Sequence, residues 1–116
     1  MADLTKRTKD FALRVIRLYS SLPSSTVARV IGKQVLRLDT SIGAHYREAY
    51  RSRSDAESIG KIEVALQELE ETIYQFELLI KSELVSEKRL ANLSQEVSEL
   101  IAIFIASVKK VKQKCN

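Results

Sequence analysis

The chain has 116 residues, of which 45% are hydrophobic and 29% charged, so it has the length and composition of one globular domain with a core. Three glycines, one proline and a single cysteine, Cys115, exclude a turn-rich sheet protein and an internal disulfide. The longest apolar run, 100–106, is much shorter than the roughly 20 residues of a membrane-spanning helix. Since the sequence shows no signal peptide, we expect one domain over residues 1–116, located in a reducing cytoplasm.

The net charge of +4 hides a strong segregation of charge along the chain. Residues 1–53 hold eleven Lys or Arg against four acids, residues 54–108 hold four against eleven, and residues 109–116 add four lysines. Such segregation allows one surface to be basic while another pairs internally or faces a partner.

Helical periodicity begins with two segments in the basic part of the chain. The first, about 3–21, repeats apolar residues at spacings of three, four or seven and ends before Pro23. The second, about 25–51, starts at serines that can serve as its N-cap. It contains Gly32 and Gly43, which indicate either close backbone packing or a bend in the helix.

Two further helical segments follow in the acidic part. A capping-box pattern, Ser54-Asp55-Ala56-Glu57, opens a third helix that runs to about Lys81, and Ser86 can cap a fourth helix over about 87–112. The expected core positions of the third helix alternate by three and four: Ile59, Ile62, Leu66, Leu69, Ile73, Phe76 and Ile80. Together the four segments predict an all-α fold, an antiparallel up-down four-helix bundle.

One side of the second helix is basic over its whole length. On a helical wheel, five cations lie opposite its apolar face over about 33 Å: Arg29, Lys33, Arg37, Arg47 and Arg51. A charged run is ordinarily a solvated face, but no acid of this helix falls within the arc, which favours a polyanion such as RNA or DNA. Tyr46 and Tyr50 flank the cations and can stack on bases, although boundary or core packing is the more usual role of such tyrosines.

Catalytic and metal-binding patterns are absent from the sequence. The one histidine, His45, has Ile42 three residues before it, so the paired Glu-x-x-His motifs of a di-iron bundle are missing, as are a zinc cluster and a phosphate-binding glycine loop. We expect His45 to pack or to form a hydrogen bond at the edge of the core. Glu68 and Glu71 can act as acid and base in principle, but glutamates on helix surfaces are usually only solvated. We therefore predict no catalytic residue, no metal site and no cofactor.

Three apolar residues of the third helix, Val64, Tyr74 and Leu78, lie outside its main apolar face and predict self-association. The leading functional hypothesis is a non-enzymatic oligomer that binds RNA or DNA through the basic side of the second helix. The alternative is an oligomeric scaffold that recruits an acidic protein through the same cations.

A family resemblance lies between residues 34 and 79. It rests on Thr40-Ser41-Ile42-Gly43-Ala44-His45, Glu48-Ala49, Lys61-Ile62-Glu63-Val64-Ala65-Leu66-Gln67-Glu68 and Glu71-Thr72-Ile73-Tyr74. With these motifs the chain resembles the small four-helix-bundle proteins encoded by intervening sequences in bacterial 23S rRNA genes, also labelled S23 ribosomal proteins. The family usually has Asn in place of His45, an aromatic residue in place of Ser58 and Trp in place of Gln75.

The resemblance implies a homopentameric barrel of bundles. Accessory proteins of diversity-generating retroelements look similar, and they use a basic surface to engage nucleic acid and a reverse transcriptase. For this chain the resemblance therefore implies a homo-oligomer whose partners are RNA or DNA and a nucleic-acid enzyme such as a reverse transcriptase.

Overall fold

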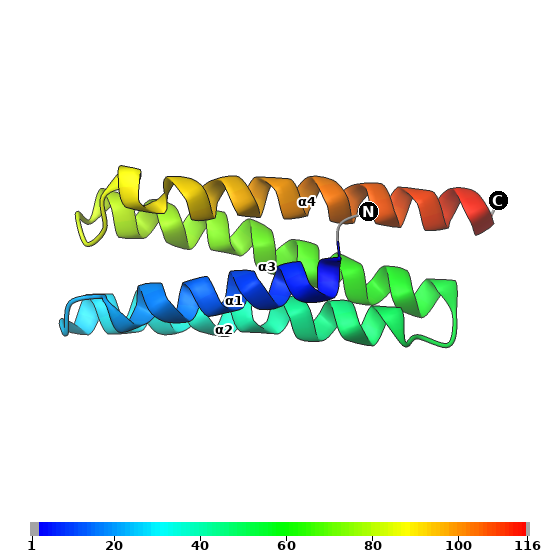
Figure 1. Cartoon of the computed structure of the whole chain (residues 1–116), viewed down its shortest axis with the longest axis horizontal. Helices are drawn as coiled ribbons and strands as arrows, with labels where there is room; N and C mark the ends of the chain where they lie inside the picture. Colours follow the sequence, from blue (N-terminus) through cyan, green and yellow to red (C-terminus); the bar gives the residue numbers. More distant parts are fainter. Residues whose placement is uncertain (1–2, 116) are drawn as a thin grey trace.

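Four antiparallel helices pack side by side into an elongated bundle of 49 × 21 × 20 Å (Figure 1). The computed structural model describes residues 3–115. The helices are α1 (Leu4–Ser20), α2 (Thr26–Tyr50), α3 (Asp55–Lys81) and α4 (Glu87–Cys115). The predicted all-α four-helix bundle is confirmed, and the assembly of five copies stays a prediction.

Side-chain caps fix where each helix begins. The oxygens of Asp3, Ser25, Ser54 and Ser86 each accept a hydrogen bond from the main-chain N–H three residues later, at 3.1–3.3 Å. Each bond satisfies an amide that has no partner within its own helix. The three serines expected to act as caps do so.

The two glycines of α2 allow α1 to approach it closely. A Cβ atom at Gly32 would lie 2.8 Å from Leu22 Cδ1 and 2.9 Å from Tyr19 Cδ1, and one at Gly43 would lie 3.1 Å from Thr8 Oγ1. α2 is helical without a break across both positions. Of the two interpretations of these glycines, close packing is therefore confirmed and a bend is wrong.

The core face of α3 is rotated from the expected one by part of a turn. Ala65, Thr72 and Leu79 are fully buried, whereas Ile73, expected in the core, is 40% exposed. Three other expected core residues are only partly buried: Ile59, Leu66 and Ile80. Ile62, Leu69 and Phe76 are buried as expected. Because α3 carries apolar residues on more than one side, periodicity alone could not tell on which side of these three the core continues.

α1 and α4 are the least closely packed pair of neighbouring helices. Arg7 bridges them, with Nε 2.9 Å from Glu96 Oε2 and Nη2 2.8 Å from Glu96 Oε1. The same Nη2 lies 2.7 Å from Glu99 Oε1. These two carboxylates hold the pKa of Arg7 above its usual value. Polar side chains thus hold together a pair of helices whose backbones stay apart.

Replacing two glycines by alanine should have opposite effects on thermal stability. Gly32→Ala should lower the melting temperature, because its methyl group would overlap Leu22 and Tyr19, and such overpacking costs about 1–3 kcal/mol. Gly60→Ala should raise it, because nothing lies within 4 Å of the new Cβ atom and alanine gains about 0.5–1 kcal/mol in a helix. Thermal unfolding followed by circular dichroism measures both. Equal melting temperatures for the two variants would contradict the close packing of α1 on α2.

Candidate nucleic-acid interface

The basic stripe of α2, defined as Arg29, Lys33, Arg37, Arg47 and Arg51, is exposed along its whole length. Arg51 is the C-cap residue of the helix and the other four lie within it. Among the residues that the structure describes, no ion pair is formed by Arg29, Lys33 or Arg37. The guanidinium of Arg37 instead donates to Gln34 Oε1 at 3.1 and 3.3 Å. This end of the stripe therefore has no direct ion pair, although the charge of Arg37 is felt by Glu68 of α3.

The other end of the stripe carries mixed charge, partly from Glu48 of α2 itself and partly from residues of α3. Arg47 and Arg51 line a shallow depression of about 300 Å³ together with Glu48, Glu57 and Lys61. Lys61 Nζ lies 3.0 Å from Glu48 Oε1. Glu57 and Lys61 come from α3, so only the fold brings them beside the two arginines.

The two tyrosines beside the stripe differ. The packing role expected for Tyr46 is confirmed, since its ring stacks on Phe104 with centroids 5.9 Å apart and planes at 14°, and burial raises the pKa of its hydroxyl. The same expectation is wrong for Tyr50, which is 81% exposed. Tyr50 is the last residue of α2, and its ring is left to solvent near Arg47 and Arg51.

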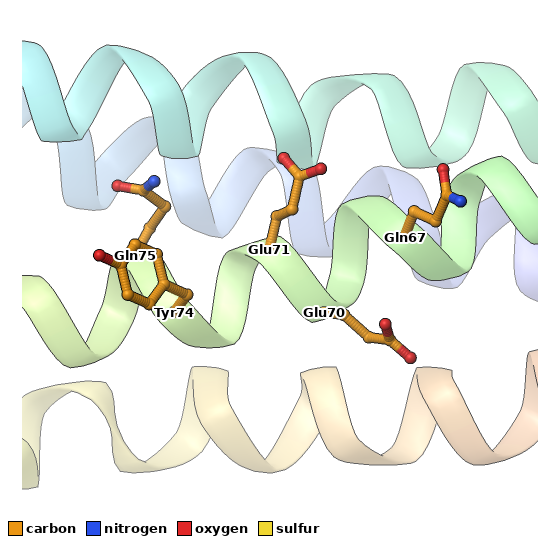
Figure 2. A pocket seen from close by; sticks show the side chains of 5 residues that line it. All are labelled: Gln67, Glu70, Glu71, Tyr74 and Gln75. Atoms are coloured by element: carbon orange, nitrogen blue, oxygen red, sulfur yellow. The ribbon is translucent and has the colours of Figure 1, made fainter.

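The predicted interface residues of α3 include two that are clearly exposed. Val64 is 39% and Tyr74 58% exposed, while Leu78 is half-buried. Tyr74 borders an open depression of about 730 Å³ whose other lining residues are Gln67, Glu70, Glu71 and Gln75. In Figure 2 the side chains of Gln67, Glu71 and Gln75 point toward α2, and that of Glu70 points toward α4. This face of α3 is acidic and partly apolar, in contrast to the basic stripe.

A polar cluster between α2 and α3 includes His45 and Glu68. His45 Nδ1 lies 2.7 Å from Glu68 Oε1, so His45 forms the hydrogen bond expected at the edge of the core. Glu68 is therefore turned toward α2, whereas Glu71 is exposed and lines the depression of α3. The two glutamates do not form an acid–base pair across a cleft.

Asp39 is a buried acid that the sequence-based interpretation missed. It is fully buried, its Oδ1 shares a hydrogen bond with the Thr72 hydroxyl, and its Oδ2 has no hydrogen-bond partner. The Thr72 hydroxyl also lies 2.8 Å from the main-chain oxygen of Glu68, but it has only one proton to donate. Asp39 Oδ1 and the main-chain oxygen of Glu68 are therefore alternative acceptors of the single Thr72 proton. The signal in the sequence was weak, because Asp39 lies beside Ala28 at the edge of the apolar arc of the second helix and not within it.

The burial of this cluster changes its acidity. Burial raises the pKa of Asp39 to about 7, the Glu68 charge acts in the same direction, and the Thr72 hydrogen bond opposes it. Burial also raises the pKa of Glu68, against the hydrogen bond and charge of His45. Because Asp39 has no exposed surface, no substrate reaches it, and we interpret the cluster as part of the packing between α2 and α3.

The structure adds two findings on metals and membranes. Within residues 3–115, no three His, Cys, Asp or Glu side chains come together in an arrangement that can hold a metal ion. None of the four helices, as far as they are described, combines the length and the apolar character needed to cross a bilayer.

The variant Asp39→Asn should remove a pH-dependent loss of stability. The pKa of Asp39 is about 7 in the folded protein, against 3.8 for an ordinary aspartate, so the folded state binds an extra proton between these pH values. The parent protein therefore loses stability as the pH rises from 4 to 7, and an uncharged Asn does not. From pH 5 to pH 8, the unfolding free energy of Asp39→Asn minus that of the parent should increase by about 2–3 kcal/mol.

Chemical denaturation at several pH values measures this difference. Asp10→Asn, at an exposed position of α1, is the matched control and should leave the pH dependence unchanged. A constant difference between Asp39→Asn and the parent would contradict a protonated, buried Asp39.

Comparison with known proteins confirms the resemblance found in the sequence. A crystal structure at 1.70 Å resolution of a protein with unknown function from the S23 ribosomal protein family of Bacteroides thetaiotaomicron VPI-5482 has a similar fold, with a TM-score of 0.86 and 35% sequence identity. The similarity covers 91% of this chain and 98% of that one. Among curated proteins, none matches this chain. Neither the family description nor that of the structure names a catalytic activity. The family profile of the 23S rRNA-intervening sequence proteins matches residues 2–106, and the chain belongs to this family.

Proposed function

We propose that this protein is a non-enzymatic oligomer of the cytoplasm that binds RNA through the basic stripe of α2. The observation that carries the proposal is the run of five exposed cations on one outward face, three of which have no ion-pair partner among the described residues. Phosphate contacts from Lys and Arg supply most of the affinity of sequence-independent nucleic-acid binding. A linear array of cations suits a linear polyanion.

The exposed ring of Tyr50 favours an unpaired strand over a duplex. At 81% exposure it is the most exposed of the large hydrophobic side chains in the described part of the chain. Bases of a single strand can stack on such a ring, whereas bases within a duplex cannot reach it. Because the ring lies at the end of α2 beside Arg47 and Arg51, one strand could contact both phosphate-binding and base-stacking groups.

The acidic face of α3 supports the same orientation. Glu70 and Glu71 border its depression and would repel a polyanion, while the stripe of α2 attracts it. A nucleic acid should therefore approach from the side of α2. An acidic protein would be attracted to the same stripe, but it has no need of the exposed Tyr50.

Removing two cations from the stripe should weaken RNA binding without unfolding the protein. Lys33→Gln with Arg37→Gln should lower affinity similarly for unrelated single-stranded RNAs, because phosphate contacts carry no base information directly. Each lost contact should also flatten the slope of log affinity against log salt by about 0.7. Both side chains are exposed, so the unfolding free energy should stay within about 0.5 kcal/mol of the parent.

Fluorescence anisotropy over a salt series measures this effect. Lys81→Gln with Lys109→Gln, which removes the same charge from exposed positions of α3 and α4, is the control. An unchanged slope and affinity in the folded stripe variant would exclude these two residues as contacts. Binding of an acidic protein but of no RNA would favour the scaffold hypothesis instead.

Self-association should involve the outward side of α3. We expect light scattering to show an oligomer, five copies by the family resemblance, and Tyr74→Glu to dissociate it, because a charge would replace a 58% exposed aromatic ring beside Glu70 and Glu71. Lys81→Gln with Lys109→Gln should leave the oligomer intact. A measured mass of 13.1 kDa, that of a single chain, for the parent protein at micromolar concentration would contradict this assembly.

A further inference from the structure

Three arginines converge on a groove between α1 and α4, outside the basic stripe of α2. The groove has a volume of about 280 Å³. Its polar lining comes from Arg14 and Arg17 of α1 and from Arg89 and Asn92 of α4, and the buried side chains Leu18 and Leu93 complete it. Sequence reasoning could not find this groove, because the arginines of α1 and α4 meet only through the antiparallel packing of the first and last helices.

None of the acids nearest this groove lines it. Arg7 binds both carboxylate oxygens of Glu96 and one of Glu99, and the second oxygen of Glu99 accepts a hydrogen bond from Gln95 at 3.0 Å. Asp10, one turn before Arg14, is exposed and does not line the groove. One end of the α1–α4 seam is thus a closed ion-pair cluster, and the other end is a concentration of positive charge.

The position of Arg89 points to a ligand. It lies in the first turn of α4, where the helix dipole disfavours a cation. A hydrogen bond from its Nη2 to the Ser21 hydroxyl holds the guanidinium across the seam. A guanidinium has five N–H donors, so donors remain for a further acceptor. The helix end that repels Arg89 attracts an anion.

We propose that the α1–α4 groove binds a phosphate group through Arg14, Arg17 and Arg89. Guanidinium groups match phosphate oxygens with paired hydrogen bonds, and three of them around one groove supply charge and direction together. The volume leaves room for a phosphate group together with part of the molecule that carries it. The phosphate comes either from an RNA phosphodiester or from a free ion. This inference is independent of the α2 stripe.

Nitrogen-15 NMR of the arginine Nε–H groups tests this proposal on the full chain. Inorganic pyrophosphate and a short single-stranded RNA are titrated separately. We expect the signals of Arg14, Arg17 and Arg89 to shift together and to saturate. A response to pyrophosphate identifies a site for free phosphate, and a response to RNA alone identifies a contact with the polymer. No saturable response to either probe would overturn the proposal.

Substitutions then assign the response to the groove. Arg89 is left unchanged, because it bonds to Ser21, and its NMR signal reports binding. In the double variant Arg14→Gln with Arg17→Gln, the affinity for the responding probe, read from this signal, should fall at least tenfold. The corresponding double lysine variant should show an intermediate loss, because it keeps the charge without the paired donors. If the double Gln variant does not fold, the exposed Arg17→Gln change alone should weaken binding at least threefold.

Two controls separate the groove from general charge and from the proposed function. Lys6→Gln with Lys9→Gln removes the same charge from α1 outside the groove and should leave binding unchanged. An equal loss in this control would overturn the proposal. In the double variant Lys33→Gln with Arg37→Gln, the signals of Arg14, Arg17 and Arg89 should still shift with whichever probe shifts them in the parent. A failure of the α2 stripe as an RNA surface is therefore distinguishable from a failure of the groove.

Discussion

The rotation of α2 about its own axis is the constraint on which the rest of the molecule depends. On one side, Gly32 and Gly43 bring α2 close to side chains of α1 and of the turn that follows it. On another side, Asp39 bonds to Thr72 of α3. These two contacts allow one orientation of α2 only, because a turn of the helix would place side chains where the glycines now lie. With both flanks fixed, the remaining side of α2, which carries the basic stripe, faces solvent.

Charge is arranged differently at the different helix seams. Between α1 and α4, Glu96 and Glu99 neutralise Arg7. Between α2 and α3, burial favours a neutral Asp39 against the opposing effect of the hydrogen bond from Thr72. Three cations of the α2 stripe, Arg29, Lys33 and Arg37, and the three arginines of the α1–α4 groove form no ion pair with a described residue. These two surfaces are therefore places where an external anion can meet clustered positive charge.

Much of the fold could be predicted from the sequence, because the signals are local. The serine caps and the apolar spacing within each helix gave its limits, and the stripe of α2 followed from spacing as well. The core face of α3 was predicted correctly at Ile62, Leu69 and Phe76. It was predicted wrongly at Ile73, because the burial of the smaller Ala65 and Thr72 in its place depends on how closely α2 packs. Contacts between distant segments were out of reach for the same reason. Examples are Glu57 of α3, which lies beside Arg47, and the three arginines that meet in the α1–α4 groove.

The central claim is that the packing of α2 presents an RNA-binding surface. Its most direct test is backbone amide NMR of the full chain during titration with a single-stranded RNA. The account predicts that the largest saturable shifts follow the outward side of α2 from Arg29 to Arg51, whereas the acidic side of α3 around Glu70 and Glu71 stays unperturbed. Shifts confined to α3, or none on α2 at saturating RNA, would contradict it.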